Sequence, residues 1–524
     1  MTPGRVALAA GVAGVGYRIV LLAHDVPPAN ADEGTTGLAA LHIATGTDFP
    51  IFFYGQQYLG AIQAYLAVPW ISAFGTTWWA LRIPPLILFA AFLGLMYLLT
   101  RRLYSPWFGT VIVALLALGA DRVVKNALIG GGGYPESSVL GAALMLGAAA
   151  LAASADPAAG SGPAGPRARR LLAFAGWGLA AGLVLWGHWL LLPYLAAAGA
   201  LLVAGCWREL RRWPGAAALA GLLIGAAPLI SHNLTAAPGA DSWTVLRALQ
   251  TAGGEAPLAD RLYGGVIVGL PLSTGMCPPA HCTGWQLWFG PVYLVLLVIA
   301  GVMAVRGLRA ATTRAERAQQ GARLALLAAA TLTIWLYVDT AGAAETPTES
   351  ARYLHYGLIS LPAVLWPLWP VAARGAAARR IPATAVLAAV AGLMVVATGA
   401  LIRAVPAYET QARDERDLVV ALDRLGLDRI YSEYWTCNRL TFVTRERVLC
   451  AVLDDRLHRG FDRYPPHAEA VWASPRPAYV LPIDEPIDGI FAARLRASGI
   501  SAQVDEVAGY HIYRPAENVG VPLA

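Results

Sequence analysis

About eleven apolar runs, each followed by polar or charged residues, dominate this sequence. Hydrophobic residues make up 57% of the 524 residues and charged residues only 14%, whereas soluble domains contain about 25% charged residues. A membrane helix needs roughly 17 to 25 mostly apolar residues. The sequence therefore predicts a polytopic α-helical membrane protein with about 11 transmembrane helices. The runs lie at 6–23, 83–99, 108–120, 137–153, 171–185, 190–206, 216–230, 287–305, 324–338, 357–371 and 381–402.

Arginine residues cluster in every second connection between these runs. Arg5 precedes the first run, and later clusters include Arg101 with Arg102 and Arg208 with Arg211. Because Lys and Arg accumulate in cytoplasmic loops, we expect the N-terminus inside, the C-terminus outside, and a first outside loop at 24–82. The same bias accounts for the net charge of +6, so we expect a lipid bilayer and no nucleic acid as a partner.

The segment 58–74 is apolar enough to be a further span, but a crossing there would move every later arginine cluster to the other side. It also contains Gln63 and Pro69, and Gln56 and Gln57 lie just before it. We therefore expect a helix that lies along the membrane surface.

The composition changes after the last run. From about residue 404 charged residues become frequent, and short β-like runs alternate with helical ones. This pattern predicts two domains: a transmembrane domain at 1–403 and a small extracytoplasmic α/β domain at 404–524.

Four of the five cysteines fall in regions that this topology places outside, as two candidate disulfide pairs: Cys277 with Cys282, and Cys437 with Cys450. Disulfides persist in oxidising compartments. Cys206 lies at a predicted cytoplasmic helix end. Two other interpretations stay open: isolated apolar cysteines, and half of a metal site in the first pair, which has a histidine between its members.

Two adjacent carboxylates, Asp32 and Glu33, follow the first apolar run. The loop after them is apolar and aromatic, and we expect it to line a substrate cavity with Tyr54, Gln56, Gln57 and Tyr58. Desolvation by such a loop would suit a carboxylate for general base catalysis. An ordinary solvated loop entry explains the acidic pair equally well.

The second predicted outside loop contains Asp121, four consecutive glycines and Glu136. Glycines let a backbone approach a ligand closely, which would direct Glu136 to the same surface as Asp32. The alternative is a flexible hinge that ends at a carboxylate in the first turn of a helix, where acidic residues are favoured.

Cationic and aromatic side chains gather in two other outside connections. His188 lies between Trp186 and Trp189, while Arg352, Tyr353 and His355 precede the tenth run. A guanidinium can grip a phosphate through two hydrogen bonds, so these residues form a candidate phosphate site. The alternatives are a hydrogen-bonded interfacial histidine and an arginine that reaches the lipid headgroups.

Taken together, these motifs resemble the GT-C superfamily of integral membrane glycosyltransferases. The likeness is to bacterial members related to protein O-mannosyltransferases and to the aminoarabinose transferases of lipid A. It is carried by the Asp32–Glu33 pair, the stretch YGQQYLG that leads through WWALRIPP, the acidic second loop, and ESARYLHY before a late run. The HPP stretch of the mannosyltransferases is missing after the acidic pair, which leaves the acceptor open.

The resemblance implies transfer of a sugar from a polyprenyl monophosphate carrier to an acceptor hydroxyl at the outer face of a bacterial inner membrane. Asp32 would be the general base, with inversion at the anomeric carbon. Glu136 or Asp121 would position the acceptor or an ion, and Arg352 would hold the carrier phosphate. The acceptor could be a lipid, a glycan or a protein; no cofactor would be required, and a divalent metal is possible.

Two other functions remain open. A ligase acting on a polyprenyl-diphosphate-linked glycan would need a second cation beside Arg352. A flippase or transporter would carry charges in mid-span, whereas the charges here lie almost wholly at the ends of the predicted spans.

Overall fold

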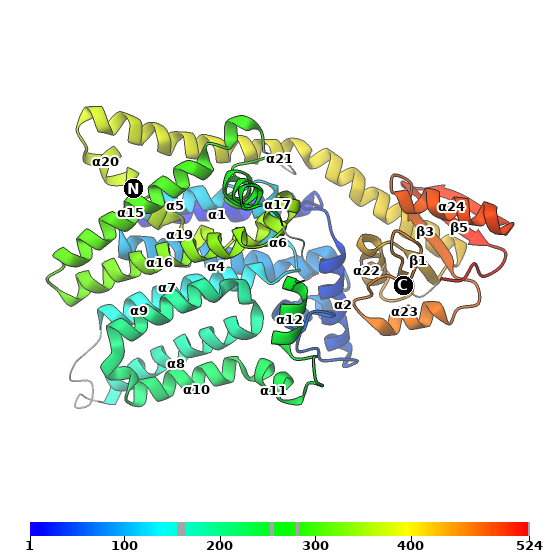
Figure 1. The fold of residues 1–524 in the computed structure, drawn as a ribbon, viewed down its shortest axis with the longest axis horizontal. Coiled ribbons are helices and arrows are strands. Elements are labelled where there is room, and N and C mark those ends of the chain that lie inside the picture. Colours follow the sequence, from blue (N-terminus) through cyan, green and yellow to red (C-terminus); the bar gives the residue numbers. More distant parts are fainter. Residues whose placement is uncertain (155–163, 252–255, 279–281, 522–524) are drawn as a thin grey trace.

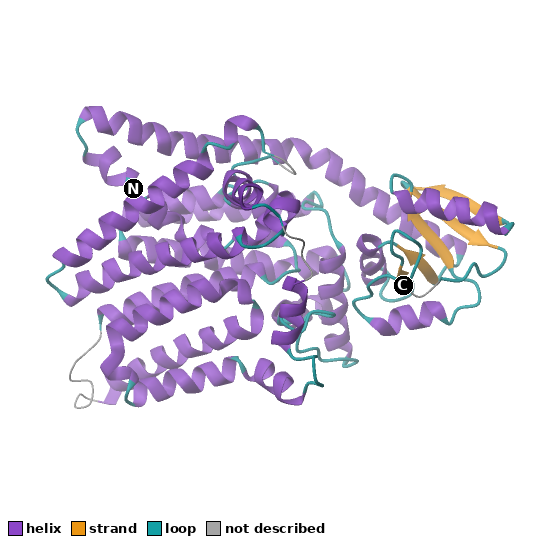
Figure 2. Ribbon diagram, viewed as in Figure 1, coloured by secondary structure: helices purple, strands orange, loops and turns teal. Residues whose placement is uncertain are grey.

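The computed structural model describes residues 1–154, 164–251, 256–278 and 282–521. A bundle of long helices forms one end of the molecule and a small α/β domain forms the other (Figures 1 and 2). Among the described residues, eight helices are long and apolar enough to cross a membrane, and three bent helix pairs raise the number to as many as eleven. The prediction of a polytopic helical membrane protein with a small α/β domain is confirmed.

The long helices are α1 (Pro3–Ala23), α4 (Trp78–Leu103), α7 (Tyr134–Ala153), α8 (Ala164–Gly187), α9 (Leu192–Leu210), α15 (Phe289–Ala310), α16 (Arg314–Val338) and α21 (Ala377–Leu425). The bent pairs are α5 (Pro106–Ala117) with α6 (Asp121–Leu128), α10 (Trp213–Gly225) with α11 (Ala227–Thr235), and the segment Pro347–Leu354 with α19 (Gly357–Leu365) and α20 (Leu368–Arg374). Shorter helices between them are α12 (Ser242–Thr251), α13 (Leu258–Leu262), α14 (Leu270–Ser273), α17 (Gly342–Glu345) and α18 (Pro347–Ser350).

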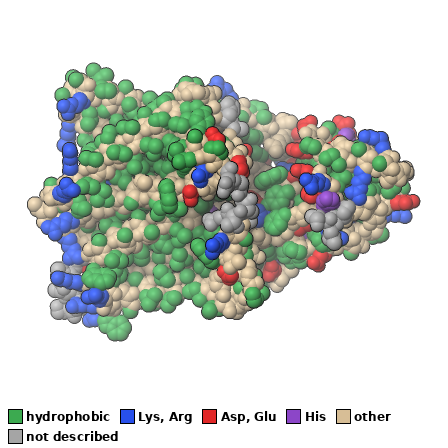
Figure 3. Space-filling view, viewed as in Figure 1, with side chains coloured by type: hydrophobic (Ala, Val, Ile, Leu, Met, Phe, Trp, Pro, Cys, Tyr) green, Lys and Arg blue, Asp and Glu red, His purple; other side chains and the backbone are tan. Residues whose placement is uncertain are grey.

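Basic side chains mark one end of the bundle. Figure 3 shows Lys and Arg in a row at the end farthest from the α/β domain. Arg101, Arg208, Arg309 and Arg374 lie in the last turns of α4, α9, α15 and α20. The helices thus place their arginine clusters on a common side, as the loop pattern of the sequence predicts.

Two helices, α2 (Ala31–Thr45) and α3 (Ile62–Phe74), lie between α1 and α4. With 13 residues, α3 is shorter than the roughly 20 residues that a membrane-spanning helix needs. The placement of 58–74 along the surface is therefore compatible with the helix that forms there.

The α/β domain is built on a five-stranded sheet with the order β2-β1-β3-β5-β4. Strands β1 (Arg429–Ser432), β2 (Leu449–Val452) and β3 (Ala478–Pro482) are parallel, while β5 (Tyr510–Pro515) is antiparallel to β3 and to β4 (Ala502–Val507). The connections contain α22 (Tyr434–Val443), α23 (Pro465–Trp472) and α24 (Pro486–Ser498).

Helix α21 joins the two domains without a break. It is 49 residues long, so the predicted boundary after residue 403 falls inside it. Leu418 and Leu422, near its end, are buried with Ile430 and Val480 in the core of the α/β domain. The last turns of α21 thus belong to that domain, because their apolar side chains are buried against its sheet rather than in the bundle.

Candidate active site

The two carboxylates after the first span lie in the first turn of α2. The side chain of Asn30 caps this helix by accepting a hydrogen bond from the backbone N–H of Glu33 at 2.9 Å. Acidic residues are stabilised at this position by the helix dipole. Because consecutive helical residues point about 100° apart, Asp32 and Glu33 have different surroundings.

Glu33 points into the protein. Its side chain is fully buried and forms a two-pronged ion pair with Arg82 of α4, at 2.8 Å from Nε and 2.6 Å from Nη2. Its Oε1 also accepts a hydrogen bond from the backbone N–H of Gly130 at 3.3 Å. Both oxygens are therefore occupied, and Glu33 joins α2 to α4 and to the glycine loop. This geometry supports a structural role for Glu33 in place of the expected catalytic one.

Asp32 points toward the α/β domain. Its Oδ1 accepts hydrogen bonds from the hydroxyl of Tyr434 at 2.8 Å and from Nη2 of Arg463 at 3.1 Å. Its Oδ2 has no hydrogen bond to a described residue, and the side chain is 23% exposed. The carboxylate is thus held by one oxygen and open at the other.

Tyr434 and Arg463 also contact each other, since Nε of Arg463 donates to the Tyr434 hydroxyl at 2.7 Å. The guanidinium lies 4.9 Å from the ring centroid of Phe53 and 5.2 Å from that of Phe461. Burial and the Asp32 carboxylate both raise the pKa of Tyr434, so its hydroxyl stays protonated and can donate to Asp32.

The approach of α22 to α2 brings these groups together. A Cβ on Gly34 would lie 2.6 Å from the backbone oxygen of Asn438, and one on Gly37 would lie 2.5 Å from the Phe442 ring. Asn438 also donates to the Thr35 hydroxyl at 2.7 Å. Only glycine at these two α2 positions lets α22 pack close enough for Tyr434 to reach Asp32.

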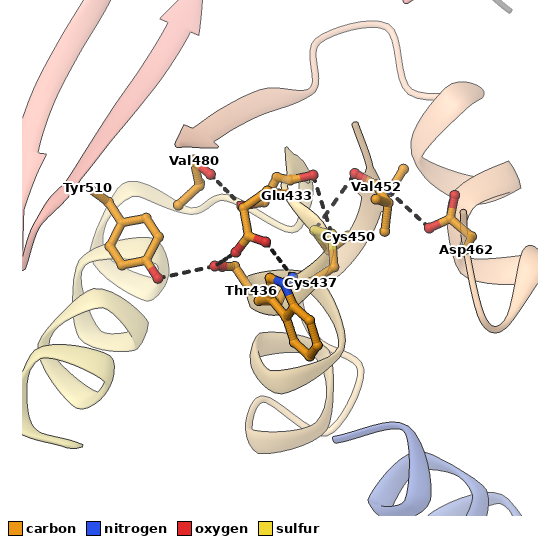
Figure 4. The surroundings of a disulfide bond; sticks show 11 residues. Glu433, Thr436, Cys437, Cys450, Val452, Asp462, Val480 and Tyr510 are labelled. Atoms are coloured by element: carbon orange, nitrogen blue, oxygen red, sulfur yellow. Dashed lines mark hydrogen bonds between the residues drawn. A yellow bond between two sulfur atoms is a disulfide. The ribbon is translucent and has the colours of Figure 1, made fainter. Parts of the chain in front are cut away.

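A disulfide braces this part of the α/β domain. Cys437 of α22 is bonded to Cys450 of β2, and Asp462, next to Arg463, accepts a hydrogen bond from the backbone N–H of Val452 at 3.0 Å (Figure 4). The second pair singled out from the sequence, Cys277 and Cys282, is also a disulfide. Cys206 is a free, buried thiol.

The glycine loop passes over the start of α2. A Cβ on Gly131 would lie 3.2 Å from the backbone carbonyl carbon of Asp32, and Gly132 and Gly133 have φ angles of +79° and +71°. These conformations are readily adopted only by glycine. The loop therefore acts as a close lining beside Asp32 rather than as a loose hinge.

Arg352 and Tyr58 complete the surroundings of Asp32. Arg352 interacts electrostatically with Asp32, Tyr134 and Tyr353 and forms no ion pair with a described residue. Tyr58 interacts with Asp32, Arg352 and Arg463, and burial raises the pKa of its hydroxyl. Two guanidinium groups and several phenols thus surround one carboxylate.

His188, His355 and Glu136 lie in a neighbouring buried cluster. The ring of Tyr134 is 5.4 Å from His188 and 5.7 Å from His355, and His188 is hydrogen-bonded to the hydroxyl of Tyr356. Glu136 lies beside His188, across Gly133, and its carboxylate has no hydrogen-bond partner among the described residues. The hydrogen bond to Tyr356 gives His188 a structural role, whereas Nδ1 of His355 is buried and has no hydrogen-bond partner among the described residues.

The remaining sequence candidates form no contact with Asp32 among the described side chains. Tyr54 is hydrogen-bonded to His42 at 2.7 Å and to Asp48 at 2.9 Å, so it belongs to another cluster and not to the expected substrate cavity. Gln56 and Gln57 are half-buried in a turn, and neither side chain forms a hydrogen bond to a described residue. Asp121 begins α6, and its side chain lies outside the described part of the structure.

A cavity of about 520 Å³ lies between α21 and the segment that joins α1 to α2. Arg82, Glu415 and Trp78 are among its lining residues, and Asp32 is not. Arg82, the partner of Glu33, therefore borders this cavity, whereas Asp32 does not.

Reasoning from the sequence missed Tyr434 and Arg463. They lie 402 and 431 residues from Asp32, in a domain with no recognisable catalytic pattern. The sequence around these two residues does not indicate a catalytic role, because a tyrosine and an arginine in a charged domain are ordinary surface residues.

No protein-family model and no curated protein sequence matches the chain. Solved structures do match it. ArnT from Cupriavidus metallidurans bound to undecaprenyl phosphate superimposes with a TM-score of 0.57 at 15% identity, covering 99% of this chain and 98% of that one. The apo state of the same protein gives a TM-score of 0.56 at 14% identity and covers 92% and 93% of the two chains.

The apo oligosaccharyltransferase of Archaeoglobus fulgidus gives a TM-score of 0.49 at 12% identity, over 99% of this chain and 75% of that one. The likeness to ArnT extends over both domains and nearly the full length of both chains. The chain therefore has the fold of ArnT over nearly its full length.

Proposed function

We propose that this protein is an inverting glycosyltransferase that moves a sugar from a polyprenyl monophosphate carrier to an acceptor hydroxyl. The observation that carries the proposal is an open carboxylate with a guanidinium near it that forms no ion pair with a described residue. Oδ2 of Asp32 has no partner among the described residues, while Arg352 interacts with Asp32 but forms no ion pair with a described residue. A base and a cation for a leaving phosphate thus lie within electrostatic range of one another.

In the proposed reaction Oδ2 of Asp32 takes the proton of the acceptor hydroxyl as its oxygen bonds to the anomeric carbon. The bond from that carbon to the phosphate oxygen breaks, and the phosphate leaves on its lipid carrier. Arg352 stabilises the charge that develops on the phosphate. Arg463 and Tyr434 hold Oδ1 and so keep the carboxylate oriented.

The fold supports a lipid-linked donor, since ArnT with the same architecture was solved bound to undecaprenyl phosphate. Basic side chains lie in a row at the end of the bundle farthest from the α/β domain (Figure 3), whereas Asp32 contacts that domain through Tyr434 and Arg463. This arrangement supports an active site on the extracytoplasmic face of the inner membrane. We assign Glu136 and Asp121 no step in the transfer.

A second candidate function is a ligase that acts on a polyprenyl diphosphate donor. It is favoured by Arg463, a second guanidinium that shares Tyr58 and Asp32 with Arg352. The monophosphate donor is preferred because the charge of Arg463 is already balanced by its ion pair with Asp32.

The buried guanidinium of Arg18 in α1 is a charge that could indicate an ion path and therefore a transporter. Arg18 donates hydrogen bonds to the carbonyls of Gly14, Ala117 and Leu118, so it stabilises the end of α5. Its charge therefore has a structural use and marks no ion path.

The test is transfer from a panel of radiolabelled polyprenyl monophosphate and diphosphate sugars in membranes that contain the wild type or Asp32→Asn. We expect transfer from a monophosphate donor and a loss of about 10²- to 10⁴-fold in Asp32→Asn, the range for a removed general base. Asp25→Asn, which alters an exposed carboxylate paired with Arg416, is the matched control. An active Asp32→Asn enzyme would disprove the base assignment, and exclusive use of diphosphate donors would favour the ligase.

A further inference from the structure

A second polar cluster lies at the other end of α2, away from Asp32. It consists of His42 of α2 with Glu446 and His467 of the α/β domain, whose ligand atoms all lie within 4.8 Å of one another. Nε2 of His42 is 2.8 Å from Oε1 of Glu446, and Nε2 of His467 is 2.7 Å from the same oxygen. Both histidines are buried and Glu446 is partly exposed.

The hydrogen bonds behind His42 fix its tautomer. The hydroxyl of Tyr54 donates its single hydrogen to Oδ2 of Asp48 at 2.9 Å. Nδ1 of His42, 2.7 Å from the same hydroxyl oxygen, must therefore be the donor in that contact. In a neutral imidazole only one nitrogen carries a hydrogen, so Nε2 of a neutral His42 presents a lone pair to the Glu446 carboxylate.

A lone pair and a carboxylate oxygen 2.8 Å apart repel each other unless a positive charge lies between them. That charge is either a proton, which would make His42 an imidazolium, or a metal ion. Metal-ligating histidines usually donate their second ring N–H to a carboxylate or another acceptor, which orients the ring. The chain from His42 through Tyr54 to Asp48 is an arrangement of this kind.

The backbone also holds Glu446 in an unusual position. Arg445 and Glu446 have φ angles of +53° and +59°, a region that residues other than glycine rarely adopt. Arg445 in turn donates to the hydroxyl of Thr76 at 3.2 Å. The turn is therefore docked on the membrane domain and directs Glu446 toward the two histidines.

We propose that His42, Glu446 and His467 bind a divalent transition metal, with zinc as the fitting ion. Two imidazole nitrogens and one carboxylate are ligands that suit zinc, and three protein ligands leave one position for water. Ligand atoms around a tetrahedral zinc are about 3.3 Å apart for bonds of about 2.0 Å. The two histidine–glutamate contacts, at 2.8 and 2.7 Å, would therefore lengthen slightly, and the two histidine nitrogens, within 4.8 Å of each other, would move to a similar separation.

The site would link α2 directly to the α/β domain. The same helix carries Asp32 at its start, and the same domain supplies Tyr434 and Arg463 to Asp32. A metal at His42 would thus fix the far end of the contact that holds the carboxylate. The inference is independent of the proposed transferase activity, because its test measures bound metal.

The experiment uses the full-length protein, purified in detergent with an affinity tag free of histidine. After equilibration with Zn²⁺ and removal of excess metal, we expect about one zinc per chain by inductively coupled plasma mass spectrometry. Glu446→Gln and His467→Asn should lower this to background. His458→Asn, which alters a more exposed histidine of the same domain, should leave it unchanged.

Two further measurements distinguish the loss of a metal ligand from the misfolding of a variant. Co²⁺ added to the metal-free wild type should give the visible absorption of a tetrahedral N/O site. Tyr54→Phe, which keeps all three ligands, should weaken zinc affinity by about 10-fold or more, the usual effect of losing an outer hydrogen bond. Absence of stoichiometric zinc in the wild type, or equal binding by the ligand variants, would overturn the proposal and leave a proton between the three groups.

Discussion

Arg463 of the α/β domain donates a hydrogen bond to Oδ1 of Asp32, a residue that lies 431 positions earlier in the chain. With Tyr434 it occupies one oxygen of the carboxylate that we propose as the base. The small domain is therefore part of the candidate active site, although its composition suggests only a cap or a binding module.

Removing this guanidinium should slow transfer more than it weakens donor binding. Arg463→Gln leaves Asp32 with one partner, so the carboxylate loses orientation and we expect turnover to fall by about 10- to 100-fold. Tyr434→Phe should have a smaller effect, since a neutral hydrogen bond contributes less than a charged one. Steady-state kinetics on membranes measures both, and Arg447→Gln, an exposed arginine of the same domain, serves as control. Unchanged turnover in Arg463→Gln would remove the domain from the reaction.

Arg352 should act mainly on the donor. Its guanidinium has no ion pair with a described residue, so it can bind a phosphate by donating charged hydrogen bonds to its oxygens. We expect Arg352→Ala to raise the dissociation constant for the carrier lipid by about 10-fold or more, equivalent to at least about 1.4 kcal/mol. Arg352→Lys should restore part of the affinity, because the charge returns without the fork geometry. Equal carrier binding by wild type and Arg352→Ala would contradict the phosphate role.

The ion pair between Glu33 and Arg82 should be a stability element. Both side chains are almost fully buried, and removal of one member of such a pair costs about 3 to 5 kcal/mol because the other charge is left buried. Arg82→Met should therefore lower the unfolding temperature of the detergent-solubilised protein strongly. Asp423→Asn breaks the exposed pair with Arg447 and should cost less than about 1 kcal/mol. Similar decreases in unfolding temperature in the two variants would mean that the buried pair stabilises the protein no more than the exposed pair does.

Asp462 should make stability depend on pH near neutrality. Burial raises its pKa to about 7, whereas an unfolded aspartate has a pKa of about 4. Between these values the folded protein binds more protons than the unfolded chain, so stability should fall as pH rises from about 4 to about 7 and then level off. Unfolding temperatures measured from pH 5 to 8 should show this decline in the wild type and a flatter profile in Asp462→Asn.

Glu446 titrates outside that range. In the metal-free protein, hydrogen bonds with His42 and His467 lower the pKa of Glu446 to about 2, so its contribution to stability is lost only as pH falls below about 4.5. A decline that persists in Asp462→Asn between pH 5 and 8 would assign the dependence to another group.

The membrane architecture and the position of Asp32 could be predicted because both follow from local features. An apolar run of sufficient length must avoid water, and arginines next to it cluster on one side of the membrane. The order of these signals along the chain also gave the GT-C resemblance. The side chains of Tyr54 and Glu33 could not be placed in this way, since their partners are chosen by packing: Tyr54 turns to His42, and Glu33 to Arg82, 49 residues away.

The sequence by itself determined the polytopic helical class, the two cysteine pairs and the carboxylate at the start of α2, because hydrophobicity, charge and spacing act over short stretches of chain. Only the tertiary structure decided which groups hold that carboxylate and where the two histidines meet Glu446. Those contacts join residues about 400 positions apart. They depend on the close packing of α22 against Gly34 and Gly37 of α2, for which no periodic pattern in the sequence gives a signal.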